Sequence, residues 1–141
     1  MTIVFVFGTL KQGFPNAATN RGERLAGEFE TLQAYPLHLV GERHSPWLID
    51  APGEGVPVRG QLFRVDDAVL ADMDKLERIS EPDGYRRATL VVRDTVSGTV
   101  IEVQAYLKPQ AQWQPELSRL GPLAEYTLQH AALYRKREQI A

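Results

Sequence analysis

The sequence predicts an α+β protein: a small, mixed, barrel-like or strongly bent sheet with one mid-chain helix and one C-terminal helix packed outside it. Most apolar residues alternate with polar ones along short segments, which is typical of strands. Turns rich in glycine and proline separate these segments. The apolar spacing expected of a helix occurs only twice, once in the middle of the chain and once near its end.

The first half of the chain reads as strands joined by turns. The unbroken apolar run 3–7 predicts a buried strand that stops at Gly8, and residues 9–22 predict a loop because they hold several glycines and asparagines. Short apolar or alternating runs predict four more strands: 26–30, 37–40, 47–49 and 56–65. The last two flank a Pro-Gly turn and are expected to form a hairpin.

The second half contains both predicted helices. Asp66 and Asp67 suit a helix start, the apolar stripe from Val69 to Leu76 follows at helical spacing, and this helix is expected to end near Ile79. Alternation predicts strands over 85–93 and 101–107.

A second helix is predicted over 123–137, after the Gly-Pro pair at 121–122. Its basic last turn, residues 135–137, is interpreted as complementing the helix dipole and not as a patch for RNA or lipid.

Composition narrows the classes of function. The 141 residues predict a single domain over 1–141, and the absence of cysteine excludes disulfides, thiolate catalysis, zinc fingers and iron–sulfur clusters. A net charge of −2 gives no electrostatic case for nucleic acid. No apolar stretch has the length of a membrane span, so we expect no membrane partner and a cytoplasmic protein; the oligomeric state is left open.

The sequence lacks the complete motifs of three common kinds of functional site. The glycines at 8 and 13 have the spacing of a phosphate-binding loop, but Phe14 follows them where that motif needs lysine and a hydroxyl residue. His38, Glu42 and His44 fit no zinc spacing, so no metal site is predicted, and no nucleophile elbow exists. A strand that stops at Gly8 nevertheless leaves backbone amides that could face an anion, although a plain connecting loop is the alternative.

Glu77 is the most promising candidate for chemistry. It lies on the same predicted helix face as Leu70 and Met73, so its carboxylate would meet the core at the end of the helix. Burial and the helix C-terminus would raise its pKa toward the value that suits a general base. The alternative is an ordinary salt bridge to Arg86 or Arg87. Tyr85 begins the next predicted strand and could bond to a buried carboxylate or a ligand, or simply belong to an edge strand.

These features resemble the γ-glutamyl cyclotransferase-like (AIG2-like) family over residues 3–107, and most of all its γ-glutamylamine branch. The matching motifs are Val4-Phe5-Val6-Phe7-Gly8-Thr9-Leu10-Lys11-Gln12-Gly13, Pro15-Asn16, Tyr35-Pro36-Leu37, Gly41-Glu42, Pro46-Trp47-Leu48, Pro52-Gly53, Val58-x-Gly60, Val65-Asp66, Met73-Asp74-Lys75-Leu76-Glu77 and Tyr85-Arg86-Arg87. The resemblance implies a ligand cavity at the mouth of a small β-barrel, with Glu77 as catalytic acid/base and no cofactor. It also implies that the substrate is a small γ-glutamyl compound, held by Phe7, Gly8, Thr9, Leu10 and Tyr85, with the loop amides gripping the γ-glutamyl group.

Two departures from the family pattern bear on function. Phe7 stands where the family usually has tyrosine, so any role of that hydroxyl is lost here. The segment between Glu77 and Tyr85 is about two residues longer, which leaves the leaving-group specificity open and introduces Glu81 as a rival carboxylate.

The expected reaction is intramolecular. The α-amino group of a folded γ-glutamyl amide attacks the side-chain carbonyl and releases 5-oxoproline and an amine, with one carboxylate moving the protons and loop amides holding the oxyanion. The leading hypothesis is a γ-glutamylamine cyclotransferase. Two alternatives stay open: a cyclotransferase for another γ-glutamyl compound (a γ-glutamyl amino acid or a protected biosynthetic intermediate), and a non-catalytic small-molecule-binding module on the same fold.

Overall fold

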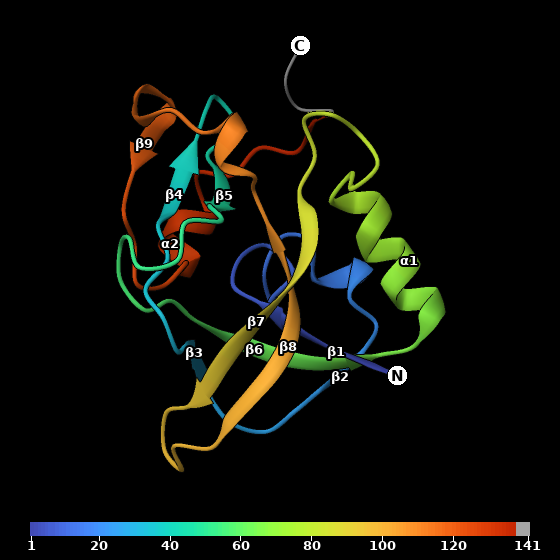
Figure 1. Ribbon diagram of the computed structural model, residues 1–141. Coiled ribbons are helices and arrows are strands. Elements are labelled where there is room, and N and C mark those ends of the chain that lie inside the picture. The colour runs from blue at the N-terminus through green and yellow to red at the C-terminus, as the bar shows by residue number, and fades with distance from the viewer. Residues whose placement is uncertain (138–141) are drawn as a thin grey trace.

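A computed structural model describes residues 1–137 and shows a five-stranded mixed barrel (Figure 1). The ring runs β1–β8–β7–β3–β6 and closes where β6 pairs with β1. Its strands are β1 (Thr2–Val6), β3 (Phe29–Thr31), β6 (Arg59–Val65), β7 (Arg86–Asp94) and β8 (Val100–Leu107). The pairing of β1 with β8 is parallel and the other pairings in the ring are antiparallel. This arrangement agrees with the barrel-like form of the predicted sheet.

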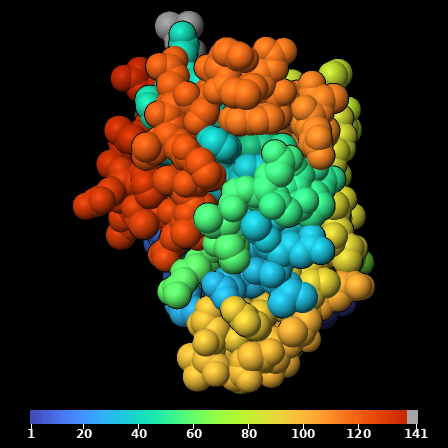
Figure 2. All heavy atoms as spheres, turned by 60° about the vertical axis from the view of Figure 1, so that its left-hand side comes forward, coloured from blue at the N-terminus to red at the C-terminus, as the bar shows by residue number. Residues whose placement is uncertain are grey.

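A second, smaller sheet lies beside the barrel. It consists of β4 (Leu37–Val40) between β5 (Ser45–Leu48) and β9 (Ser118–Leu120), while β2 (Glu23–Arg24) pairs with β6. Three short 3₁₀ turns complete the connections: η1 (Ala17–Thr19), η2 (Gln110–Gln112) and η3 (Pro115–Leu117). Figure 2 shows the residues coloured orange and red, which follow β8, side by side with the cyan and green residues around β4 and β5.

The two faces of β1 enter two different clusters of buried side chains. Phe5 and Phe7 face the interior of the barrel, where they join its main core. Val4 and Val6 face the other way and pack with residues of α1 (Asp67–Leu76). Because both faces of β1 are covered, the strand needs apolar residues at consecutive positions, and this explains the unbroken apolar run 3–7.

The mid-chain helix lies close to its predicted position. The side chain of Asp66 caps α1 by accepting a hydrogen bond from the Val69 amide at 2.9 Å, and Glu77 is the C-terminal capping residue. Val69 and Met73 are buried against the barrel. The helix thus ends where the first strand ends, which brings Glu77 to the mouth of the barrel.

The predicted hairpin of 47–49 with 56–65 is wrong. β5 pairs with β4 in the second sheet, and β6 pairs with β1, β2 and β3 in the barrel. The turn between them is tied elsewhere, because Gly53 donates its amide hydrogen to the Ala34 carbonyl at 2.9 Å. The predicted strand 26–30 is also displaced toward the C-terminus, since only Phe29–Thr31 form β3 and Gly27 before it has a φ of 112°.

The C-terminal helix is much shorter than predicted. α2 spans only Leu128–Ala131, because the segment before it bonds to the sheets: the Leu123 amide donates to Leu37 O and the Arg59 amide donates to Ala124 O, both at 2.8 Å. The interpretation of residues 135–137 as the last turn of this helix is therefore wrong, since they lie beyond it. Residues 138–141, the end of the predicted single domain, lie outside the described residues. No helix within 1–137 is long and apolar enough to cross a membrane.

Candidate active site

A cavity of about 490 Å³ opens at the mouth of the barrel. Its walls come from the end of β1 and the loop after it, the connection before β5, the end of α1 and the segment after α2. All six residues singled out from the sequence line it: Phe7, Gly8, Thr9, Leu10, Glu77 and Tyr85. The rival carboxylate of Glu81 is exposed and does not line this cavity.

Glu77 faces this cavity from the end of α1. Its side chain is half-buried, and burial raises its pKa from 4.5 to about 7 although the positive charges of Lys108, Arg43 and Arg137 oppose the rise. Within residues 1–137 its carboxylate forms no hydrogen bond or ion pair. A carboxyl group with such a pKa can both accept and return a proton near neutral pH.

The predicted alternative, a salt bridge from Glu77 to Arg86 or Arg87, is not formed. Arg87 pairs with Asp74, one turn earlier on α1. Arg86 donates hydrogen bonds to the carbonyl groups of Gly84 and Tyr85, at 3.2 and 2.8 Å. Arg87 is therefore neutralised by Asp74, which lies outside the cavity, and not by Glu77.

The loop after β1 supplies unpaired backbone donors to the same cavity. Gly8, Thr9 and Leu10 are buried, yet their amide N–H groups form no hydrogen bond with any residue the structure describes. Their carbonyl groups fix the loop, since Gly8 O accepts from the Lys11 amide at 3.1 Å and Thr9 O accepts from the Asn16 amide at 2.8 Å. Because buried amides are nearly always satisfied, three free ones along a cavity wall suit an oxygen of a ligand.

Gly8 is required by packing as well as by any ligand. A Cβ atom at this position would lie 2.8 Å from Cγ of Pro46, which is too close for two carbon atoms. The neighbour that needs this space is Pro46, a residue of the second sheet. Gly8 therefore allows the first strand and the β5 strand to meet at the cavity.

Tyr85 lines the cavity, while its hydroxyl group bonds to the second sheet. Its hydroxyl donates to the Pro46 carbonyl at 2.7 Å and lies 3.3 Å from Oγ of Ser45, so it is not bonded to Glu77. Burial, and next the charge of Glu77, raise the pKa of Tyr85 and keep it protonated. The residue links the end of the 78–85 segment to the second sheet and walls the cavity.

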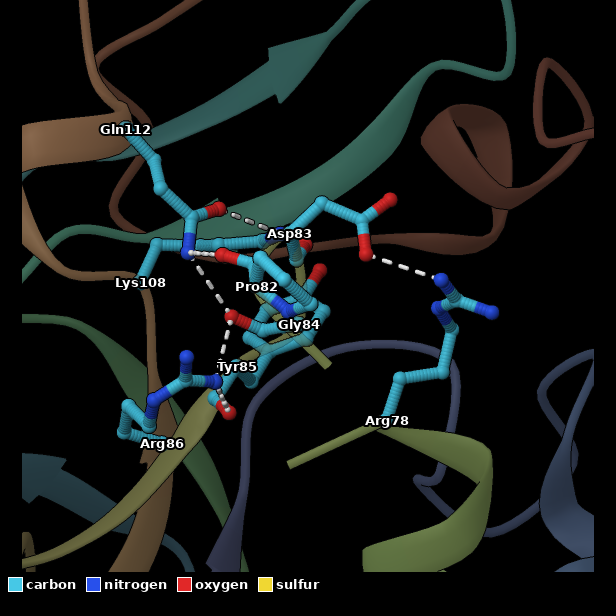
Figure 3. A network of polar contacts seen from close by, with 8 residues as sticks. All are labelled: Arg78, Pro82, Asp83, Gly84, Tyr85, Arg86, Lys108 and Gln112. Carbon is cyan, nitrogen blue, oxygen red and sulfur yellow. Dashed lines mark hydrogen bonds and ion pairs between the residues drawn. The ribbon is translucent and has the colours of Figure 1, made fainter. Parts of the chain in front are cut away.

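The 78–85 segment is a compact loop held on both sides (Figure 3). Arg78 pairs with Asp83 at 2.8 Å, and the Tyr85 amide donates to Glu77 O at 3.0 Å. From the other side, the buried ammonium of Lys108 donates to the Asp83 carbonyl at 2.6 Å, while the Gln112 side chain donates to the carbonyl groups of Pro82 and Gly84, each at 3.0 Å.

Gly84 leaves no room for a side chain in this loop, since an added Cβ would lie 1.7 Å from Arg78 O. The extra residues between Glu77 and Tyr85 thus pack within the loop, and of the segment 78–85 only Arg78 and Tyr85 line the cavity.

Sequence reasoning missed a second group of cavity residues from distant parts of the chain: Asn16, Arg43, Ser45, Pro46, Tyr134 and Arg137. Several are joined in a polar chain, in which Asn16 donates to Thr9 Oγ1 at 2.9 Å and to Tyr134 Oη at 3.3 Å. Arg43 donates to the same Tyr134 oxygen at 3.0 Å. The available signals were the motifs Pro15-Asn16 and Pro46-Trp47-Leu48, which matched the family pattern without indicating a role for Asn16 or Pro46.

The side chain of His38 contacts a serine and a tryptophan. Nδ1 of His38 lies 2.8 Å from Oγ of Ser118, and the His38 ring packs on Trp113 with 4.6 Å between ring centroids. Within residues 1–137 no three His, Asp or Glu side chains are grouped as metal ligands would be.

The chain is similar to known proteins over nearly its whole length. The family model for gamma-glutamyl cyclotransferase, AIG2-like, matches residues 4–137. The chain is 35% identical to the gamma-glutamylaminecyclotransferase of Homo sapiens, covering 98% of this chain and 99% of that protein. It is 36% identical to the one of Bos taurus, covering 96% and 82%.

A solved structure is similar over the same length. The crystal structure of an AIG2-like protein from Mus musculus superposes with a TM-score of 0.83 at 30% identity, covering 98% of this chain and 97% of that one. With this fold, this site and these relatives, the chain belongs to the AIG2-like gamma-glutamyl cyclotransferase family of enzymes.

Proposed function

We propose that this protein is a γ-glutamylamine cyclotransferase, which converts a γ-glutamyl amide into 5-oxoproline and a free amine. One observation carries the proposal: an unpaired carboxyl group with a pKa of about 7, Glu77, shares a cavity with three unpaired backbone amides, those of Gly8, Thr9 and Leu10. The first group suits proton transfer and the second suits a developing oxyanion. The names of the human and bovine relatives agree with this reaction.

The first task of such an enzyme is to hold the substrate folded. The α-amino nitrogen must lie against the γ-carbonyl carbon, and an intramolecular attack of this kind has a large effective molarity once the conformer is fixed. The rings of Phe7 and Tyr85 and the loop amides bound a cavity large enough for a glutamyl unit. Because Phe7 has no hydroxyl, the ring contributes shape alone at this position.

The second task is to move protons from the attacking nitrogen atom to the leaving one. The ionised Glu77 carboxylate takes one proton from the substrate α-ammonium, and the freed amine forms the new C–N bond at the γ-carbonyl carbon. The tetrahedral oxyanion is held by the loop amides. The old amide C–N bond then breaks as Glu77 returns its proton to the leaving nitrogen.

The ring nitrogen must lose a second proton to become a lactam, and the released amine, the stronger base, takes it up. No water is consumed and no net proton is released. A single carboxyl group near neutral pKa is therefore sufficient for both transfers.

A non-catalytic binding module on the same scaffold is disfavoured by two observations. That alternative would be supported by a cavity filled with side chains or by an exposed, ion-paired Glu77. Instead the cavity has a volume of about 490 Å³, and Glu77 is half-buried and unpaired within the described part of the chain.

The test measures 5-oxoproline release from γ-glutamyl-ε-lysine by wild type, Glu77→Gln and Glu81→Gln. Glu77→Gln keeps the shape of the side chain but cannot take a proton, so we expect its rate to fall at least about a hundredfold. Glu81→Gln is the matched control, because that carboxylate is exposed and outside the cavity, and it should keep the wild-type rate. Full activity in a folded Glu77→Gln protein would contradict the assigned role.

A further inference from the structure

A second hollow of about 500 Å³ adjoins the active-site cavity on the side of the loop 78–85. The two share four lining residues: Arg43, Ser45, Tyr85 and Arg137. The second hollow extends past Tyr85 to Trp47, Lys108 and the loop residues Pro82 and Asp83. A leaving group attached to a γ-glutamyl unit at Glu77 can therefore continue into it.

Positive charge gathers in this second hollow. Its walls carry Arg43, Lys108 and Arg137, against the single carboxylate of Asp83, which already pairs with Arg78 at 2.8 Å. These are also the three cations whose charges act on Glu77, which places them around the junction between the two hollows.

The cations in this hollow bond only to neutral groups of the described chain. Arg43 donates to the Tyr134 hydroxyl and to Arg135 O, both at 3.0 Å. Lys108 donates to Asp83 O and to Oε1 of Gln112, and its ammonium lies 4.2 Å from the centre of the Trp47 ring. Arg137 has no hydrogen bond or ion pair with another residue in the range 1–137.

Like charges crowd one another here. Burial, and after it the neighbouring charges of Arg43 and Arg78, lower the pKa of Arg137. A bound anion would relieve this repulsion, and a guanidinium group offers paired donors that match the two oxygens of a carboxylate. A leaving group that ends in an ammonium would add to the repulsion instead.

We propose that the second hollow binds a carboxylate carried by the leaving amine, with Arg43 and Arg137 as the residues that determine this specificity. The inference rests on the proposed function and narrows its substrates to γ-glutamyl amides of amino acids, in preference to those of simple amines or diamines. It also assigns a role to Arg137, which lies after α2 and lines both hollows.

The test compares three amides with the same five-carbon leaving chain. They are γ-glutamyl-5-aminopentanoate, γ-glutamylpentylamide and γ-glutamylcadaverine, which end in a carboxylate, a methyl group and an ammonium. At pH 7.5, where most of Glu77 is ionised and most of Lys108 keeps its charge, kcat/KM for 5-oxoproline release should be highest for the carboxylate and lowest for the ammonium, with at least about a tenfold span. Added salt should narrow the span, because it screens the charges.

Variants separate the local subsite from the charge of the whole protein. Arg43→Gln and Arg137→Gln should each bring the carboxylate-to-methyl ratio toward one, chiefly through KM; Arg137 is exposed, so its replacement tests the subsite even if Arg43→Gln fails to fold. Arg119→Gln removes an exposed arginine of β9, outside both hollows, and should keep the preference.

Equal kcat/KM values for the three amides, or a preference that survives both Arg43→Gln and Arg137→Gln, would overturn this inference and leave the proposed function standing. Release of 5-oxoproline from none of the three would overturn the proposed function, and this inference with it.

Discussion

Two carboxyl groups one turn apart on α1 have opposite surroundings. Asp74 pairs with Arg87 and accepts a hydrogen bond from the Tyr106 hydroxyl at 2.6 Å, so its charge is matched. Glu77 faces the cavity without a partner in the described chain, and its pKa rises to about 7. The first is suited to hold the helix against the barrel, and the second is suited to exchange protons.

The environment of Glu77 implies a cost in stability that depends on pH. Below pH 4.5 the carboxyl group is protonated in the folded and the unfolded chain, so nothing is lost. As pH rises toward 7 the unfolded chain ionises first, and above 7 the folded protein bears the full penalty, at most about 3 kcal/mol. Stability is therefore lost, not gained, across this range.

Glu77→Gln should consequently raise the free energy of unfolding, measured in urea, at pH 8.5. The gain over wild type should shrink as the pH is lowered toward 5. Glu81→Gln, at an exposed carboxylate, should show little change at either pH. A Glu77→Gln protein no more stable than wild type at pH 8.5 would mean that the Glu77 pKa is not raised.

How far single residues could be predicted depended on how local their signal was. Glu77 was identified because its spacing from Leu70 and Met73 fixes its helix face once a helix is assumed. Arg43 and Arg137 gave no such signal, since their place in the site depends on contacts between segments about ninety residues apart. Tyr85 was identified, but its hydroxyl bonds to Pro46 O, which no local pattern indicates.

Among the elements, α1 was predicted well and the region after Gly121 was not. Asp66 at the N-cap and a regular apolar stripe are local signals that fix α1 within a few residues. The C-terminal segment has helical spacing over 123–137, yet backbone bonds to Leu37 and Arg59 hold its first part extended and leave only α2 helical. Tertiary contacts override local preference there.

The loop 78–85 depends on the buried ammonium of Lys108. Burial lowers the Lys108 pKa to about 8, and the ammonium holds both Asp83 O and Gln112 while packing on the rings of Trp47 and Tyr85. Lys108→Met keeps most of the length and removes the charge. We expect it to lower the free energy of unfolding by about 1–3 kcal/mol, because two partly buried acceptors, Asp83 O and Oε1 of Gln112, lose their donor.

The same substitution should raise the pKa of Glu77, since Lys108 is the foremost positive charge that lowers it. The fall of kcat/KM at low pH, which follows the protonation of Glu77 and is called the low-pH limb of the pH profile, would then begin at a higher pH. Arg59→Met removes an exposed positive charge that lines neither hollow and should leave this limb in place. An unmoved limb in Lys108→Met would show that the charge of Lys108 does not reach Glu77.

For the whole molecule, closure of the sheet was left open by the sequence. Alternation shows that strands exist, but β1–β6 pairing joins residues about sixty positions apart, and no short pattern specifies it. The predicted hairpin was wrong for a similar reason: β5 and β6 are neighbours along the chain but belong to different sheets. Many short strands favoured a barrel-like or strongly bent sheet, and the resemblance to a known family implied the barrel.

The C-terminal segment is part of the core and not an added helix. Tyr126 is fully buried in the main cluster, its ring packs on Phe14 with 5.8 Å between centroids, and its carbonyl accepts a hydrogen bond from the buried Lys11 ammonium. Within residues 1–137 the Tyr126 hydroxyl has no hydrogen-bond partner. The ring therefore stabilises the fold while the hydroxyl does not.

Two substitutions at Tyr126 should separate these effects. Tyr126→Ala should lower the free energy of unfolding by about 3–5 kcal/mol, as loss of a buried aromatic ring does. Tyr126→Phe should leave it unchanged or raise it, because an unsatisfied buried hydroxyl is removed. Urea unfolding checks both, and a marked loss of stability in Tyr126→Phe would mean that the hydroxyl has a partner.

The role of Glu77 as the proton carrier is tested most directly by the pH dependence of kcat/KM for 5-oxoproline release by the wild-type protein. We predict that kcat/KM falls as the pH is lowered through about 7, since protonated Glu77 cannot accept the proton of the α-ammonium group. A value that stays constant from pH 8 down to pH 5.5 would contradict the role given to Glu77.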